Sequence, residues 1–171
     1  MGTPSLIKKI QGWLLGAESY RVCQYLYCLR HLEYWHNVYS AKPNLFSLIC
    51  KMYWQVRTAR QSAKTNIKID LNVVGYGFRI PHIVGGVIIH CKSVGYNCQA
   101  NSGVVVGIKY TSENMAVIGN NVELCVGAKV IGKVCIGDNV IVAPNAVVIH
   151  DVPSNSIVGG VPAKILKTNS H

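Results

Sequence analysis

An aliphatic residue recurs at every sixth position from Ile118 to Val148. The positions are Ile118, Leu124, Val130, Ile136, Val142 and Val148. A helix returns apolar residues every three or four positions and an isolated strand alternates them, so neither element explains this period. Such a short repeat is typical of a parallel β-helix, in which each unit is one short strand with a turn and three units close a triangular coil. The aliphatic side chains are therefore expected to point into the coil.

A small or β-branched residue stands four positions after each aliphatic, where we expect a tight corner. The set is Val122, Ala128, Val134, Val140, Ala146 and Val152. Glycine and asparagine fill the turns, because both accept backbone conformations that other residues avoid. The phase extends upstream through Val94, Ala100 and Val106. Residues 107–117 replace one unit without loss of phase, which predicts a loop that leaves the coil there.

Three regions are expected along the chain: a basic helical N-terminal region at 1–65, the β-helix at 66–161 and a C-terminal tail at 162–171. Helical spacing of apolar residues predicts helices over 5–15, 17–38 and 45–63. The second helix carries the clearest apolar stripe, and that stripe must pack on a partner. Its members are Val22, Tyr25, Leu26, Leu29 and Leu32.

The positive charge is concentrated in the N-terminal region, which has nine Lys or Arg against two Glu, whereas the remainder has eight against five Asp or Glu. Together with its Trp and Tyr residues, this charge fits contact with an anionic membrane surface or an acidic partner. A helical cap with cations facing water explains it as well. No nucleic-acid motif accompanies the charge, so no nucleic-acid partner is expected.

Neither a membrane span nor a secretory signal is expected, since no apolar run reaches the ~18 residues that a span needs. The chain is therefore expected in the cytoplasm, as a peripheral membrane protein if the basic region meets a membrane. Seven cysteines without a C-x-x-C pair indicate neither a disulfide framework nor a zinc site.

The hexads, together with "IPHIVGGVIIHCKSVGYNCQANSGVVVG" and "VPSNSIVGGVPAKIL", resemble the hexapeptide-repeat acyltransferases, above all their serine acetyltransferase-like members. The resemblance covers roughly residues 66–166 and is strongest to short members found with polysaccharide biosynthesis enzymes. It implies a left-handed β-helix, acetyl-CoA as the acetyl donor and no metal. It also implies homotrimers with each active site in the cleft between the β-helices of neighbouring subunits. Some members pair their trimers through the N-terminal helices.

His82 is the candidate general base, and the resemblance gives the matching histidine that role. Acetyl transfer to a hydroxyl requires removal of the hydroxyl proton as attack begins, and an imidazole that titrates near neutrality suits this task. The alternative is a histidine at a coil edge that bonds a backbone carbonyl. His90 and His150 are read as turn residues.

Departures from the family pattern bear on which acceptor molecule the protein is expected to use. Pro81 stands where serine acetyltransferases carry an Asp, and residues 107–117 lack the Arg and the second His of that family. Because a free amino acid needs a partner for its carboxylate, the sequence favours a sugar or polysaccharide precursor as acceptor, with L-serine as the alternative. The acceptor-binding candidates are Asp70, Asn72 and Asn101. Asp70 fits a locally bonded turn residue equally well.

Acetyl-CoA is expected to lie along the coil, where small residues let the backbone approach it. By resemblance, the contacts are Gly107, Gly127, Ala128, Ala143, Ala163 and Lys164.

Two interpretations from other functional classes stay open. One is a β-helical carbonic anhydrase-like metalloenzyme, which needs three imidazoles brought together; the other is a non-catalytic trimeric scaffold.

Overall fold

The computed structural model describes residues 18–111 and 113–168. The chain divides into two compact units, with the boundary after Ile67. The helix expected over 5–15 lies outside the described residues. None of the described helices is long and apolar enough to cross a bilayer.

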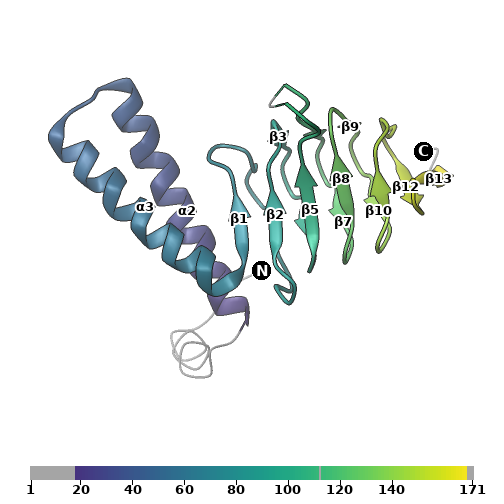
Figure 1. Ribbon diagram of the computed structural model, residues 1–171, viewed down its shortest axis with the longest axis horizontal. Coiled ribbons are helices and arrows are strands. Elements are labelled where there is room, and N and C mark those ends of the chain that lie inside the picture. The colour runs from purple at the N-terminus through teal and green to yellow at the C-terminus, as the bar shows by residue number, and fades with distance from the viewer. Residues whose placement is uncertain (1–17, 112, 169–171) are drawn as a thin grey trace. The chain divides into compact units, whose positions relative to one another are not determined.

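The first unit is a pair of helices, α2 (Glu18–Ala41) and α3 (Leu45–Thr65), joined by a short turn (Figure 1). The predicted stripe of α2 is buried at Val22, Tyr25, Leu29 and Leu32, while Leu26 is half-buried. Asn44 starts α3, because its side-chain oxygen accepts the Ser47 backbone N–H at 2.7 Å. This N-cap satisfies a backbone donor that the helix itself leaves unpaired.

The second unit is a coil of parallel strands in three sheets, with successive strands stacked along it (Figure 1). Sheet 1 contains β1 (Ile67–Ile69), β2 (Val87–Ile89), β5 (Val104–Gly107), β8 (Lys129–Ile131) and β11 (Val147–Val148). Sheet 2 contains β3 (Ser93–Val94), β6 (Val117–Ile118) and β9 (Cys135–Ile136). Sheet 3 contains β4 (Gln99–Ala100), β7 (Glu123–Leu124), β10 (Ile141–Val142), β12 (Ser156–Gly159) and β13 (Lys164–Thr168). The chain visits sheets 1, 2 and 3 in turn, as the hexads predict.

The core of the coil consists of the hexad aliphatics stacked in columns. From Ile118 to Val148, the inward residue of every unit is at most 3% exposed. In sheet 3 the parallel register places Ala100, Leu124, Val142 and Val158 directly above one another. The period of six therefore corresponds to one inward side chain per side of the coil, and this part of the prediction is confirmed.

The corner between sheets 2 and 3 requires glycine, since Gly95, Gly119 and Gly137 stack there in backbone contact. A Cβ on Gly119 would lie 2.8 Å from the Gly137 carbonyl carbon. Gly119→Ala is expected to destabilise the coil by roughly 1–3 kcal/mol through overpacking, measured by urea unfolding. Gly107→Ala is the matched control, because a Cβ there meets nothing nearer than 3.8 Å. Equal stability of the two variants would contradict this account.

The C-terminal segment differs from the expected tail. Lys164–Thr168 forms β13, which pairs antiparallel with β12. The pairing covers backbone N–H and C=O groups that the last strand of a sheet otherwise leaves open. All five side chains of β13 are exposed, so its residues show no inward pattern from which a strand could be predicted.

Candidate functional site

The predicted site residues fall at two corners of the coil. The His82 corner joins sheet 3 to sheet 1 and contains the turns at 81–86, 101–103, 125–127 and 143–146. Residues 160–163 join β12 to β13 within sheet 3 and lie at the same corner, because Gly160 and Ala163 bond Val147 of β11. The loop corner joins sheet 1 to sheet 2 and contains residues 70–73, 90–92, 108–116, 132–134 and 149–151. Sheet 1 separates the two corners in every coil, so one chain does not bring the two groups of residues together.

His82 lies exposed in the turn that precedes β2. The turn is held to the next coil, because the Gly103 N–H donates to the Gly86 carbonyl at 2.7 Å and the Ser102 hydroxyl donates to the Val84 carbonyl. Asn101 on that next coil is buried, and its side-chain amide donates to the Leu124 carbonyl at 3.4 Å. Asn101 thus stabilises the corner, and an acceptor contact of its side chain stays a prediction.

The residues expected to contact acetyl-CoA continue the His82 corner over later coils, with the exception of Gly107. Gly127 has a φ of +71°, and a Cβ there would meet the Asn145 side-chain oxygen at 2.1 Å, so only glycine fits. Ala128 is completely buried, and its backbone N–H and C=O are bonded to Cys125 and Val105, so its contact with acetyl-CoA stays a prediction. Ala163 is half-buried and donates its N–H to the Val147 carbonyl at 2.8 Å.

Ala143 is half-buried in the same corner, and Lys164 is exposed where β13 begins. The His82 corner therefore presents a row of glycine and alanine backbone, with a lysine beside its C-terminal end. Exposed side chains of Val84, Val126 and Val161 stand at the same corner, so an extended ligand there would meet apolar side chains as well as backbone.

At the loop corner, Asp70 follows β1 and His90 follows β2. The Asp70 N–H donates to the Ile89 carbonyl at 3.2 Å, and the Asp70 carboxylate pairs with Nδ1 of His90. The two side chains are 34% and 39% exposed. A carboxylate that accepts the Nδ1 proton leaves the Nε2 lone pair available as a proton or hydrogen-bond acceptor. The pair therefore has the arrangement of an oriented base.

Sequence reasoning missed this pair: it assigned Asp70 to the acceptor and read His90 as a turn residue. One signal was present in the sequence. Both residues directly follow a short strand with a buried, exposed, buried pattern, "IKI" before Asp70 and "VII" before His90. Equivalent places on successive coils lie next to each other.

Asn72 lies exposed in the turn after Asp70, with a φ of +60°. This left-handed conformation is one that asparagine accepts more readily than most residues. Asn72 thus has a local reason to be asparagine, and its contact with an acceptor stays a prediction.

Cys91 is the thiol next to the His90–Asp70 pair. Burial, followed by the negative charge of Asp70, raises the pKa of Cys91 to about 12. The thiol therefore stays protonated at neutral pH, and since the thiolate is the reactive form, Cys91 is not a nucleophile for group transfer.

Beyond the pair, the loop corner opens into a hollow of about 430 Å³, called here the loop hollow. It is lined by Lys109, Tyr110, Asn114, Ile131, Gly132, Lys133, Ile149 and His150. The strand registers place Gly107 between His90 and Ile131 along the corner. Glycine adds no side chain there.

The lining of the loop hollow contains two lysines and a histidine but no carboxylate. The loop itself is tied together, because the Asn114 amide donates to the Lys109 carbonyl at 3.0 Å and to the Thr111 hydroxyl at 3.2 Å. Lysine ammonium groups bind carboxylate or phosphate oxygens through charge-assisted hydrogen bonds. The loop hollow thus suits an anionic group.

A serine acetyltransferase of Helicobacter pylori strain J99 is 32% identical to the chain over 139 residues, a match that covers 72% of this chain and 81% of that relative. The chain belongs to the serine acetyltransferase family. Membership confirms the resemblance seen in the hexads and identifies the chain as an acetyl-CoA-dependent acyltransferase.

Other members of the serine acetyltransferase family match over a smaller share of their length. The enzyme of Synechococcus elongatus is 37% identical over 95 residues, or 54% of this chain and 39% of that protein. A crystal structure from Brucella abortus is 25% identical with a TM-score of 0.63 and covers 74% of this chain and 52% of its own. No model of a protein family matches the chain.

A serine acetyltransferase solved in complex with CoA has a TM-score of 0.64, 19% identity, and coverage of 83% of this chain and 55% of its own. This likeness shows the fold alone. The chain spans about half the length of these two solved members of the serine acetyltransferase family. Within residues 18–111 and 113–168, no three His, Cys, Asp or Glu side chains form a group that could hold a metal ion.

Proposed function

We propose that the protein transfers the acetyl group of acetyl-CoA to the hydroxyl of a small acceptor, and that L-serine is this acceptor. The observation that carries the proposal is the match to the Helicobacter pylori serine acetyltransferase over 81% of that enzyme. The preference for a sugar or polysaccharide precursor, drawn from the absent Arg, is not supported by relatives such as those of Helicobacter pylori, Synechococcus elongatus and Staphylococcus aureus, which bear the name serine acetyltransferase.

The loop hollow removes the main objection to L-serine. The objection was that residues 107–117 hold no Arg for the carboxylate of an amino acid. Lys109 from the loop and Lys133 from the next coil line one hollow with His150, and the two ammonium groups offer the carboxylate charge-assisted hydrogen bonds. A phosphate would fit the same charges, which keeps a phosphorylated sugar as the second candidate acceptor.

His82 acts as the general base in this proposal. It takes the proton from the acceptor hydroxyl as the oxygen attacks the thioester carbonyl carbon. The tetrahedral intermediate then collapses, the carbon–sulfur bond breaks, and CoA leaves as a thiolate that receives a proton. Acetyl-CoA lies along the glycine and alanine backbone of the His82 corner, near Gly127, Ala128, Ala143, Ala163 and Lys164, with its thioester toward Gly107.

The two corners supply different parts of one site in a homotrimer. His82 and the loop hollow lie on opposite edges of sheet 1 in a single chain. We therefore propose that His82 of one copy meets the loop hollow of the next, which a cyclic, head-to-tail contact allows. A left-handed coil, pairing of trimers through the helices and a cytoplasmic location stay predictions from the resemblance and the sequence.

Acetyl transfer followed by mass spectrometry tests the proposal. Purified protein and acetyl-CoA are incubated with L-serine, neutral hexoses, amino sugars, sugar phosphates and nucleotide sugars. We expect O-acetyl-L-serine as the main product. A sugar phosphate as the only product would reject L-serine but keep the anion-binding hollow. No acetylated product together with no acetyl-CoA binding would instead support the non-catalytic scaffold.

A further inference from the structure

Helix α3 has its apolar and polar residues on unexpected sides. Its buried residues are the small polar side chains Ser47, Thr58 and Thr65. Leu48 and Trp54 are half-buried, and Trp54 packs on Tyr27 of α2. Six other large apolar residues are more than half exposed: Leu45, Phe46, Ile49, Met52, Tyr53 and Val56. An ordinary surface helix turns its apolar stripe inward. The outward stripe of α3 is therefore a surface that a partner covers.

These apolar residues recur at spacings of three, four and seven, so they share one face of the helix. Arg60 and Lys64 continue this face one to two turns later, and Arg57 lies at its edge, half-buried and in contact with Cys28 of α2. Together, these nine residues are called here the outer face of α3. Its first half is apolar and its second half is cationic. Helices that lie in a membrane interface combine the same residue types, with the cations on the face opposite the apolar residues.

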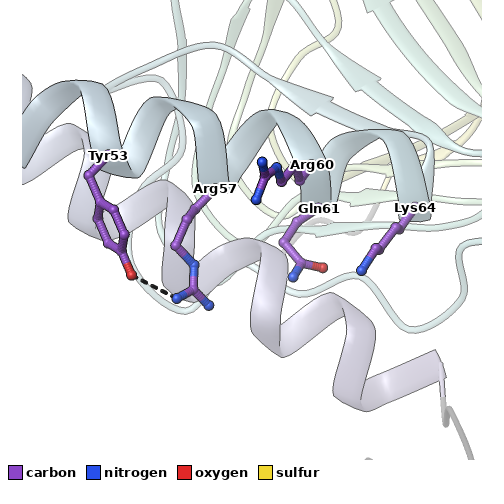
Figure 2. A pocket seen from close by; sticks show the side chains of 5 residues that line it. All are labelled: Tyr53, Arg57, Arg60, Gln61 and Lys64. Atoms are coloured by element: carbon purple, nitrogen blue, oxygen red, sulfur yellow. Dashed lines mark hydrogen bonds between the residues drawn. The ribbon is translucent and has the colours of Figure 1, made fainter.

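The cationic half of the outer face forms a hollow of its own. Arg57, Arg60 and Lys64 line it together with Tyr53 and Gln61, and Figure 2 shows Arg57, Gln61 and Lys64 along one side of α3. The Tyr53 hydroxyl accepts a hydrogen bond from Arg57 at 2.9 Å, which holds the guanidinium at the edge of the hollow. Three cationic side chains around one hollow suit a phosphate group.

Charge decides between a membrane and a second copy of this chain as the partner. α3 and the preceding turn carry Lys42, Lys51, Arg57, Arg60 and Lys64 and no Asp or Glu. Among the described helical residues the acids are Glu18 and Glu33, and Glu33 is buried and bonded to Arg30 at 2.8 Å. A second copy offers no carboxylate from its α3 to these cations, whether the two helices run parallel or antiparallel, whereas anionic lipid supplies the opposite charge.

We propose that the outer face of α3 binds the surface of a membrane that contains anionic lipid. The apolar half, from Leu45 to Val56, enters the boundary between head groups and acyl chains. Arg57, Arg60 and Lys64 bind the head-group phosphates. Both attractions act on the same face of one helix, and neither requires acetyl transfer.

Vesicle co-sedimentation of the full chain tests the proposal. One set of vesicles is phosphatidylcholine alone and the other contains phosphatidylglycerol as well. We expect binding to the second set, and weaker binding as salt rises. Arg60→Ala with Lys64→Ala is expected to weaken it about 30-fold, because each cation near an anionic surface contributes about fivefold. Lys68→Ala with Lys92→Ala removes the same charge from exposed positions of the coil and should retain binding.

Three outcomes would overturn the proposal. Equal binding to both vesicle sets, or an equal loss in the control variant, would show that the outer face does not select anionic lipid. If Ile49→Ser with Met52→Ser leaves vesicle binding unchanged but dissociates an oligomer in gel filtration, the face is a contact between copies. Acetyl transfer is measured on every variant, so a wild type that binds vesicles but transfers no acetyl group would reject only the enzymatic proposal.

Discussion

His82→Ala is expected to lower acetyl transfer by ~10²-fold or more, the contribution typical of a general base. The loss should appear in kcat, since the imidazole acts on the hydroxyl proton during attack rather than on ground-state binding. The fold should persist, because His82 is exposed in a turn and its removal opens no cavity in the core. The rate is measured from release of CoA and checked by mass spectrometry of the product.

His90→Ala is the comparison that gives this result its meaning. His90 is an imidazole oriented by a carboxylate, since it pairs with Asp70 at the loop corner. If His82→Ala keeps its rate while His90→Ala loses it, the base lies at the loop corner and the assignment of His82 is wrong. Asp70→Asn then tests whether Asp70 only orients the His90 ring or also selects its tautomer. An amide can hold the ring in place but favours the wrong tautomer.

Replacing both lysines of the loop hollow, Lys109→Ala with Lys133→Ala, is expected to raise the acceptor KM by roughly 10²-fold or more. A hydrogen bond to a charged group contributes about 1.5–3 kcal/mol, and two are removed. The KM for acetyl-CoA should change little, since its proposed contacts are at the His82 corner. Initial rates with each substrate varied in turn give both constants.

Lys68→Ala with Lys92→Ala serves again as the control, because both lysines are exposed on the coil and neither lines the loop hollow. A rise in the KM for acetyl-CoA alone would show that the hollow holds the phosphates of CoA rather than the acceptor. No change in either constant would mean that neither substrate uses these cations.

The coil could be predicted in detail because its information is local and repeated. One aliphatic at every sixth position specifies one inward side chain, and its neighbours on the next coil carry the same pattern. Ile118 and Val148 are therefore both buried, as predicted. β13 could not be predicted, because backbone pairing alone holds it and its exposed side chains carry no inward pattern.

The site was only partly predictable, since stacking decides which side chains meet. Asp70 and His90 are twenty residues apart, and they become neighbours only because one full turn of the coil separates them. The loop hollow likewise joins Lys109, Lys133 and His150 from three successive coils. An argument restricted to residues 107–117 could find only Lys109, because Lys133 and His150 lie outside that segment.

The sequence by itself determined the three-sided coil, the place where the loop leaves it and the resemblance to an acyltransferase family, because each of these is written in residues close together along the chain. Only the tertiary structure decided the partner of Asp70, the charge of the loop hollow and the outward apolar face of α3. Those features depend on which surfaces stacking covers, and a side chain is exposed or paired only in relation to residues far away in the sequence.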